Sequence, residues 1–457
     1  MDTDQEKLAM TRSTYGLLIL ACGLVASSLR DYPAGQAGGL FNNRAVGGVA
    51  VDANGVLEAP TVQDDNELAQ LREQTKLDVP APLQEFTERR AVSLKQLEAT
   101  LRKCQAEMKP IPEEVKYLAG LQRVQYVFIY PERQDIVLVG PAEGWALDDL
   151  GNVVGATTNR PVLLLDDLMV ALRSGKTSAQ EPITCSIDPT PEGLARVQAV
   201  ANRLREMGDS EQTLTRIEEA LGPQDISVTG VADTSHFART MVAADFRMKR
   251  IAMDFEPAPI NGLDSFLSMV KVNSRGMNNM LPRWWLAPNY EPLARTADGL
   301  GWELRGQGVK CMSNEDYVDS TGQKTTAVSK NPAAEKWAAT MTKKYPELAA
   351  HDSSFGELRN IMDLAVIGAL IEKERLLDIA NLQLPRLMSE QPLERYPAPK
   401  QTASKASAIK QRGGWVISAS GGVEMLPWHI ASETETVEAV GDVRSDMSAV
   451  VEEIWWE

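Results

Sequence analysis

Residues 183–191, Ile183-Thr184-Cys185-Ser186-Ile187-Asp188-Pro189-Thr190-Pro191, contain a strand pattern that passes directly into a helix start. Apolar and polar side chains alternate from Ile183 to Ile187, which predicts a strand with one buried face. Thr190 is a helix-capping residue, and Pro191 then occupies the first helical position, which proline favours. The sequence therefore predicts a strand followed immediately by a helix.

The following residues repeat this alternation. Apolar residues at helical spacing predict a helix that ends at Gly208 and a second helix over residues 211–221 that stops at Gly222. A strand over residues 226–231 precedes a helix that Thr234 or Ser235 caps and that runs to about Met253. Helices that alternate with strands must pack on a sheet. We therefore predict an α+β fold with a mixed β-sheet and covering helices.

The N-terminal half carries several shorter elements. A separate N-terminal β-hairpin is expected within residues 38–60, because Asn54 and Gly55 tolerate the positive φ of a tight turn. Ser93 and Gln96 form a capping box for a helix to about Met108. The remaining predicted elements are strands over 124–130 and 135–139, a hairpin around 148–152, a short buried strand over 162–165 and a helix over 166–173.

The C-terminal half contains a long helix to about Asp378, for which Ser354 and Glu357 form a capping box. Strands are expected over 283–286, 302–304 and 309–312, and a helix over 332–344. Residues 391–413 are rich in Pro, Ala, Ser and Lys, which predicts a linker. Residues 414–457 should form a separate hairpin that turns at Gly421-Gly422 and then an acidic tail. Residues 61–390 form the main α+β region, with a division into two subdomains near 180 left open.

The N-terminus carries an uncharged run from Tyr15 to Ala26. Its length suits the apolar region of a secretory signal and is too short for a membrane-spanning helix. Translation from Met10 would give this signal a short basic start with Arg12. We therefore expect residues 1–37 to be a signal peptide or an uncleaved N-terminal anchor, and the protein to be exported to the periplasm or cell envelope.

The composition is acidic, with 63 Asp and Glu against 47 Lys and Arg and a net charge of −16. Such a chain repels phosphate backbones and anionic lipid. Nucleic acid is therefore not an expected partner, and membrane contact is expected only through an uncleaved N-terminal segment. Apolar residues make up 43% of the chain, which is enough to build a core.

Few residues suggest catalysis. Only three histidines are present, so a His-rich metal site is not expected, and no cofactor motif occurs. His236 is either a general base or, as we favour, a first-turn residue of a capped helix. Cys185 could act as a nucleophile with His236, but its place on the apolar face of a strand favours an inert thiol.

Acidic residues offer two further hypotheses. Residues 148–152 resemble part of a calcium loop, but a hairpin turn explains the pattern better. Asp245, with Asp254 and Glu256, could supply the carboxylate pair of a glycoside hydrolase, as could Asp166-Asp167. The sequence does not show that any of these side chains converge.

Aromatic residues cluster at Trp284, Trp285 and Tyr290. Adjacent residues on a strand face opposite sides, so one tryptophan can be exposed and stack on a sugar ring or peptide. Burial at a sheet is the commoner role for tryptophan and remains the favoured alternative.

Several long segments together resemble an uncharacterised planctomycete family of exported proteins, a DUF1598-like domain of unknown function. They are 117–132, 135–145, 185–195, 234–239, 247–253 and 282–292. The resemblance extends over about residues 44–427. It implies lineage and export, and it carries no activity, ligand or catalytic residue.

These observations favour a non-enzymatic binding or scaffolding component of the cell envelope, with an envelope protein or polysaccharide as its partner. The alternative is an envelope or periplasmic hydrolase that uses carboxylates with or without His236. The chain shows no internal duplication of the kind expected for a two-lobed binding protein.

Overall fold

The strand and helix predicted at residues 183–191 are both present in the computed structural model. It describes residues 49–52, 54–59, 77–203, 210–270, 278–318, 324–326, 332–409, 415–417 and 419–453. β8 (Ile183–Pro189) alternates buried and half-buried residues, and α5 (Pro191–Arg203) starts at the proline. The predicted secretory segment, residues 1–37 with Met10, lies outside the described residues.

The elements after α5 also follow the predicted order. α6 (Ser210–Leu221) ends at Gly222, whose φ of 69° suits glycine. β9 (Gln224–Thr229) pairs antiparallel with β8. α7 (His236–Ala252) is capped by Ser235, whose hydroxyl accepts a hydrogen bond from the Ala238 amide. Ser235, one of two predicted caps, is therefore the cap.

The larger sheet is mixed and follows the order β1-β2-β15-β9-β8-β18-β10-β13-β14, and β17 joins it to β16. β18 is central, because it pairs antiparallel with β8 and parallel with β10. The other strands are β1 (Ala50–Val51), β2 (Val56–Glu58), β10 (Asn278–Asn289), β13 (Gly308–Val318), β14 (Lys324–Thr326), β15 (Gln401–Thr402), β16 (Ser407–Ile409), β17 (Trp415–Ile417) and β18 (Ser420–Met425).

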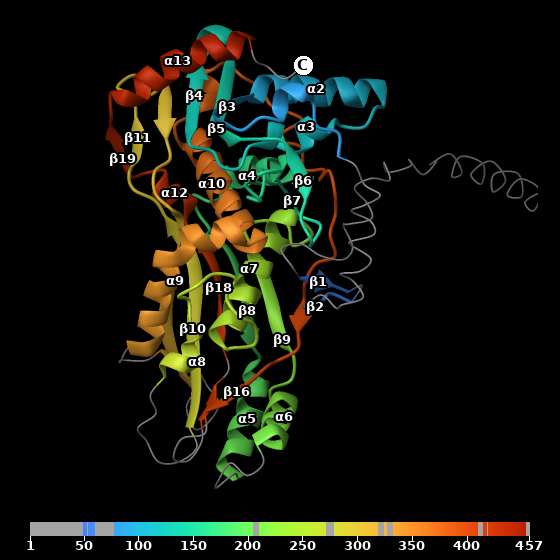
Figure 1. The fold of residues 1–457 in the computed structure, drawn as a ribbon, viewed down its shortest axis with the longest axis vertical. Coiled ribbons are helices and arrows are strands. Elements are labelled where there is room, and N and C mark those ends of the chain that lie inside the picture. The colour runs from blue at the N-terminus through green and yellow to red at the C-terminus, as the bar shows by residue number, and fades with distance from the viewer. Residues whose placement is uncertain are drawn as a thin grey trace, which may run out of the picture. The chain divides into compact units, whose positions relative to one another are not determined.

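A second sheet has six strands in the order β19-β11-β12-β4-β5-β3. Its strands are β3 (Thr87–Ser93), β4 (Tyr126–Tyr130), β5 (Asp135–Ala142), β11 (Leu293–Arg295), β12 (Gly301–Glu303) and β19 (Thr434–Thr436). α2 (Leu94–Glu107) begins at the predicted cap, Ser93. α13 (Ala439–Glu453) packs on the face of this sheet that carries Phe128, Tyr130 and Val139 (Figure 1). A small hairpin of β6 (Trp145–Leu147) and β7 (Val153–Gly155) lies outside both sheets.

The helix α10 (Ser353–Lys373) occupies the core. Every residue from Ser354 to Ile371 is buried, which is typical of a helix that is covered on all sides. It packs on α4 (Leu165–Thr177), α7 and α9 (Pro332–His351). The shorter helices are α3 (Glu113–Lys116), α8 (Phe266–Met269), α11 (Leu376–Ile379) and α12 (Pro427–Ile430), with 3-10 turns at Ala81–Leu83, Leu118–Gly120 and Pro131–Arg133.

Two predicted helix and strand boundaries are wrong. The cap of α10 is Asp352, whose carboxylate accepts from the Ser354 amide, so Ser354 and Glu357 are not a capping box. Residues 162–165 do not form a strand, because α4 already begins at Leu165. The apolar run there is buried, and single backbone hydrogen bonds to Val153 and Leu121 hold it without forming a strand ladder. Burial explains its composition.

The predicted C-terminal hairpin is also wrong. Gly421 and Gly422 lie inside β18, where a Cβ at Gly421 would come within 1.6 Å of the Trp284 carbonyl oxygen. The glycines therefore allow close approach of two strands, which is the other common role of glycine in a strand. The N-terminal hairpin is not separate either, because β2 pairs with β15.

The predicted linker and acidic tail contribute regular structure. β15 and β16 come from residues 391–413, and α13 comes from the tail. Short strands pair through backbone groups, so they form without an apolar composition. No division occurs near residue 180, because the six-stranded sheet combines β3–β5 with β11, β12 and β19 from beyond it.

The architecture is α+β, which confirms the predicted fold class. Among the described residues, no helix is both long and apolar enough to cross a bilayer.

Candidate functional site

The candidate site is a buried polar cluster where α4, α7 and α10 begin. Asp166 and Asp167 lie in the first turn of α4, and His236 is the first residue of α7. Glu357 lies near the start of α10. All four side chains are buried, although three of them are Asp or Glu, which are usually exposed. We call these four residues the His236 cluster.

His236 is held by a carboxylate. Its Nδ1 lies 2.9 Å from Asp167 Oδ2, and its ring meets that of Tyr396 edge-on at 5.7 Å. Burial by itself would lower the pKa of His236, but the charge and hydrogen bond of Asp167 outweigh it. Together with Glu357 and Asp166, they raise the pKa of His236 to about 9. His236 is therefore an imidazolium at neutral pH.

Glu357 and Asp166 are buried carboxylates. Burial, opposed by the His236 charge and aided by Asp148, Asp167 and Asp352, raises the pKa of Glu357 to about 8. Burial and the Asp167 charge raise the pKa of Asp166 to about 6. In the described part of the chain, Glu357 Oε2 has no hydrogen-bond partner, as expected for an acid that keeps its proton.

Sequence reasoning gave Glu357 the wrong role. The sequence predicts a capping box there, but Glu357 is a buried acid on a helix that is covered on all sides. Gly356, Arg359 and Asn360 beside it are not apolar, so the local sequence carries no signal of this burial.

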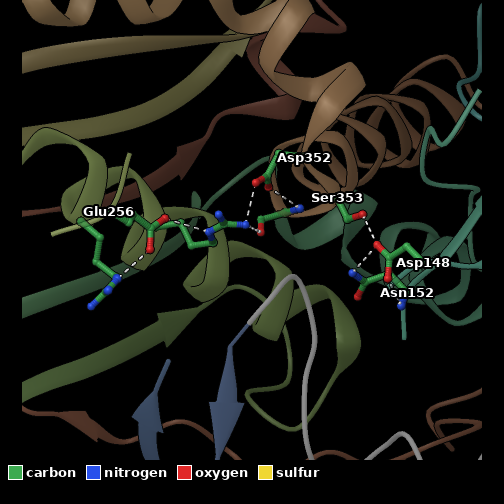
Figure 2. Close-up of polar contacts among 8 residues, drawn as sticks. Asp148, Asn152, Glu256, Asp352 and Ser353 are labelled. Atoms are coloured by element: carbon green, nitrogen blue, oxygen red, sulfur yellow. Dashed lines mark hydrogen bonds and ion pairs between the residues drawn. The ribbon is translucent and has the colours of Figure 1, made fainter. Parts of the chain in front are cut away.

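A second polar network surrounds the N-terminus of α10 (Figure 2). Asp148 accepts hydrogen bonds from Asn152 Nδ2 at 2.9 Å and from Ser353 Oγ at 2.5 Å. Its other oxygen accepts from the amides of Leu150 and Asn152. The carboxylate therefore closes the β6–β7 turn and ties it to α10, which supports the turn interpretation over a calcium loop.

The same network includes the predicted carboxylate Glu256. Arg247 Nε and Arg250 Nε bind its two oxygens at 3.0 Å and 2.7 Å (Figure 2). Arg247 also pairs with the cap of α10, Asp352, at 2.6 Å. These ion pairs fasten α7 to the start of α10, and the structure does not bring Glu256 together with Asp245.

Asp245 pairs with a lysine in the core. Lys249 Nζ lies 2.8 Å from Asp245 Oδ2 and also donates to the carbonyl of Ile187 at 2.8 Å. Burial raises the pKa of Asp245 to about 6, against the lowering effect of Lys249. Lys249 was not predicted, although its position four residues after Asp245 on a helix is the spacing of an ion pair.

Cys185 lies next to this pair rather than to His236. Burial and the Asp245 charge raise the pKa of the Cys185 thiol. A thiol with a raised pKa is a poor nucleophile at neutral pH. Cys104, Cys185 and Cys311 are all free and buried. The structure thus does not bring Cys185 and His236 together as a nucleophile and its base.

The three predicted aromatic residues have different surroundings. Trp284 is fully buried, with ring centroids 5.0 Å from Phe266 and 4.9 Å from Trp337. Trp285 faces the other side and is partly exposed, with the Arg283 guanidinium 5.9 Å from its ring centre. Trp284 is therefore a core residue, and Trp285 is the one that can meet a ligand.

Tyr290 takes part in a polar contact. Its hydroxyl donates to Asp363 Oδ1 at 2.7 Å, and Arg123 binds the same carboxylate through two nitrogens. Burial and the Asp363 charge raise the pKa of Tyr290. Tyr290 therefore stays neutral and orients Asp363, which is a residue that the sequence did not single out.

The His236 cluster has two of the three members of a catalytic triad, the histidine and its carboxylate. A carboxylate on Nδ1 of a histidine orients the ring as in serine hydrolases. Among the described residues, however, His236 hydrogen-bonds only to Asp167 and Thr240. The Ser235 hydroxyl donates a hydrogen bond to the Ala232 carbonyl and accepts one from the Ala238 amide, so it is already engaged. No group of three or more His, Cys, Asp or Glu in the described ranges is arranged to hold a metal.

Residues 185–266 match the family model described as protein of unknown function (DUF1598). This stretch runs from β8 to α8 and contains His236, Asp245 and Lys249. Over these residues the chain is similar to that domain of unknown function, which supports the DUF1598-like resemblance there. No curated protein and no solved structure matches the chain.

Proposed function

We propose that this chain is an exported, non-enzymatic binding protein of the cell envelope, which holds an envelope polysaccharide or protein through a face of the larger sheet. The observation that carries the proposal is the position of the groups that could perform catalysis. His236, Asp245 and Cys185 are all in the interior, and the first two are engaged in ion pairs. The uncharged run Tyr15–Ala26 supports export.

The binding surface that we propose consists of Arg283, Trp285 and Met312 and is called the Trp285 face. Trp285 and Met312 are directly opposite each other on β10 and β13, and Met312 is 39% exposed. The opposite side of β10 carries Trp284, which packs on Trp337 of α9. One side of these strands is thus covered, while the other offers an aromatic ring beside a cation.

Such a face suits a sugar ring or a peptide. The π-face of an exposed tryptophan stacks on apolar CH groups, and a neighbouring guanidinium adds a hydrogen-bond donor to the partner. Residues of this kind dominate the energy of binding surfaces.

The test is co-sedimentation of the purified mature protein with insoluble envelope polysaccharide and with envelope protein fractions. We expect Trp285→Ala to weaken binding by about tenfold or more, since anchoring aromatic residues contribute about 2 kcal/mol or more. The matched control is Trp428→Ala, which removes another partly buried tryptophan from a different element, α12.

Equal binding by wild type and Trp285→Ala would contradict the proposal that the Trp285 face binds the ligand. The hydrolase alternative has its own measurement in the same assay. Release of soluble sugar or peptide that disappears in His236→Asn or Glu357→Gln, with the fold retained, would favour the hydrolase over the binding protein.

A further inference from the structure

Arg359 is a buried arginine with no counterion in contact among the residues that the structure describes. It lies on α10, is 8% exposed, and its Nε has no hydrogen-bond partner in the part of the chain that the structure describes. A buried charge without a partner is costly. Such a group indicates either a function or an external partner that supplies the opposite charge.

A carboxylate on the same helix is already occupied. Asp363, one turn after Arg359, accepts from Arg123 Nε at 2.8 Å and from Arg123 Nη2 at 3.0 Å. The Tyr290 hydroxyl donates a further hydrogen bond to Asp363 Oδ1. Asp363 therefore neutralises Arg123 and contributes only a more distant interaction to Arg359.

A second arginine, Arg123, is close to Arg359. A Cβ built on Gly308 would lie 2.7 Å from Arg359 Cγ and 3.7 Å from Arg123 Nη2, so both arginines flank this glycine. The charges of Arg123 and Arg160 both lower the pKa of Arg359, after the larger effect of burial, to about 10. Arg359 is still protonated at neutral pH, and the local charge is positive.

The group reaches solvent. The Arg123 side chain is 17% exposed, and Gly306, whose carbonyl accepts from Arg123 Nη1, is exposed. Arg160 is exposed and follows Asn159, which has a left-handed φ of 54°. Two guanidiniums and one carboxylate thus lie near the surface of a protein with a net charge of −16, and the charge of Arg160 also acts on Arg359.

We propose that Arg359, with Arg123, binds the oxyanion group of a small anionic ligand, either a phosphate or a carboxylate. Guanidinium groups offer planar, bidentate donors that match both oxyanions. A bound anion supplies the charge that Asp363 does not supply to Arg359. This site goes beyond the proposed function and does not depend on the Trp285 face.

The experiment measures the thermal unfolding midpoint (Tm) of the full chain at constant ionic strength, with chloride replaced stepwise by inorganic phosphate or by acetate. We expect a saturable rise in the Tm of the wild type, because a ligand that binds only the native state stabilises it. Saturation separates binding from the unsaturable effect of excluded salts. A response to one anion alone identifies the group, and a response to neither overturns the proposal.

Variants of Arg359 separate binding from a structural role. We expect Arg359→Gln to have a Tm in chloride equal to or above that of the wild type, since it removes an unpaired buried charge, and to lose the anion response. Arg359→Lys should keep the charge but bind the anion at least about tenfold more weakly, because lysine lacks the fork geometry.

The matched control is Arg89→Gln, which removes the same charge from an exposed position on β3 and should keep the full response. An anion response that persists undiminished in both Arg359 variants overturns the proposal.

Discussion

At the scale of single residues, the His236 cluster makes stability depend on pH. The folded pKa of His236 is about 9 against an ordinary value of 6.5, so its contribution is complete below about pH 6.5 and is lost as pH rises through 9. Glu357 acts in the same direction. Its folded pKa is about 8 against 4.5, so the folded state keeps an extra proton and loses stability as pH rises between these values.

We therefore predict that the free energy of unfolding falls as pH rises from about 6.5 to 9. Asp167→Asn should lower it by about 3 kcal/mol at pH 6, because a buried cation loses its partner, and should flatten the dependence on pH. Urea unfolding across this pH range measures both effects.

Glu357→Gln should gain stability relative to the wild type at pH 9, since it cannot ionise. The control is His429→Asn, which changes an exposed histidine that pairs with exposed Glu433 and should leave the pH profile unchanged. A wild-type profile that is flat or rises from pH 6.5 to 9 would contradict the assigned protonation.

At the scale of elements, the crossing of α4 and α10 depends on two glycines. A Cβ on Gly368 would lie 2.2 Å from the Ala171 carbonyl oxygen, and one on Gly175 would lie 2.4 Å from the Gly368 carbonyl oxygen. The two backbones thus touch directly, and no side chain fits between them.

We predict that Gly368→Ala lowers the free energy of unfolding by about 2 kcal/mol, although alanine favours a helix, because the methyl group forces the helices apart. The control is Gly441→Ala in α13, where the nearest atom to the new Cβ is Thr296 Cγ2 at 3.7 Å. That change should be neutral or stabilising by up to about 1 kcal/mol. Chemical unfolding of both variants provides the comparison, and an unharmed Gly368→Ala would refute the close crossing.

Elements with strong local signals were predictable. The caps at Ser93 and Ser235, the proline at the start of α5 and the alternation in β8 depend on neighbours in sequence. β18 was missed because its partners, β8 and β10, are more than a hundred residues away in sequence. Only these distant neighbours turn Gly421 from a turn residue into a strand residue.

The same limit applies to the candidate sites. His236 was identified from its residue type, and its predicted place in the first turn of a helix is confirmed. Its partner Asp167 and the acid Glu357 come from α4 and α10, which only the tertiary fold brings to it. Arg359 was not noticed, because a single arginine in a sequence does not reveal whether a counterion reaches it.

At the scale of the whole molecule, α13 covers one face of the six-stranded sheet. Phe128, Tyr130 and Val139 on that sheet form a small core with Val440 and Met447 of α13. The Tyr130 hydroxyl donates to the Arg444 carbonyl at 3.0 Å, and Arg444 Nη2 donates to the Ile129 carbonyl at 2.7 Å. The C-terminal segment is therefore an integral part of the fold.

We predict that ending the chain after Glu438 exposes this apolar face, which should lower the Tm and increase the binding of a hydrophobic dye. Ending it after Glu453 retains α13 and should leave both properties unchanged. Normal stability in the shorter chain would show that α13 does not cover the sheet in solution.

The central position of β18 has a consequence for biogenesis. Strands β8 and β10 are synthesised long before residues 420–425, which must enter between them. Until then β8 and β10 each have one edge with unpaired backbone groups, and unpaired edges can form hydrogen bonds with the strands of other chains. In a chain exported as we propose, this pairing site would still be open on arrival, and residues 420–425 close it only when they pair with β8 and β10.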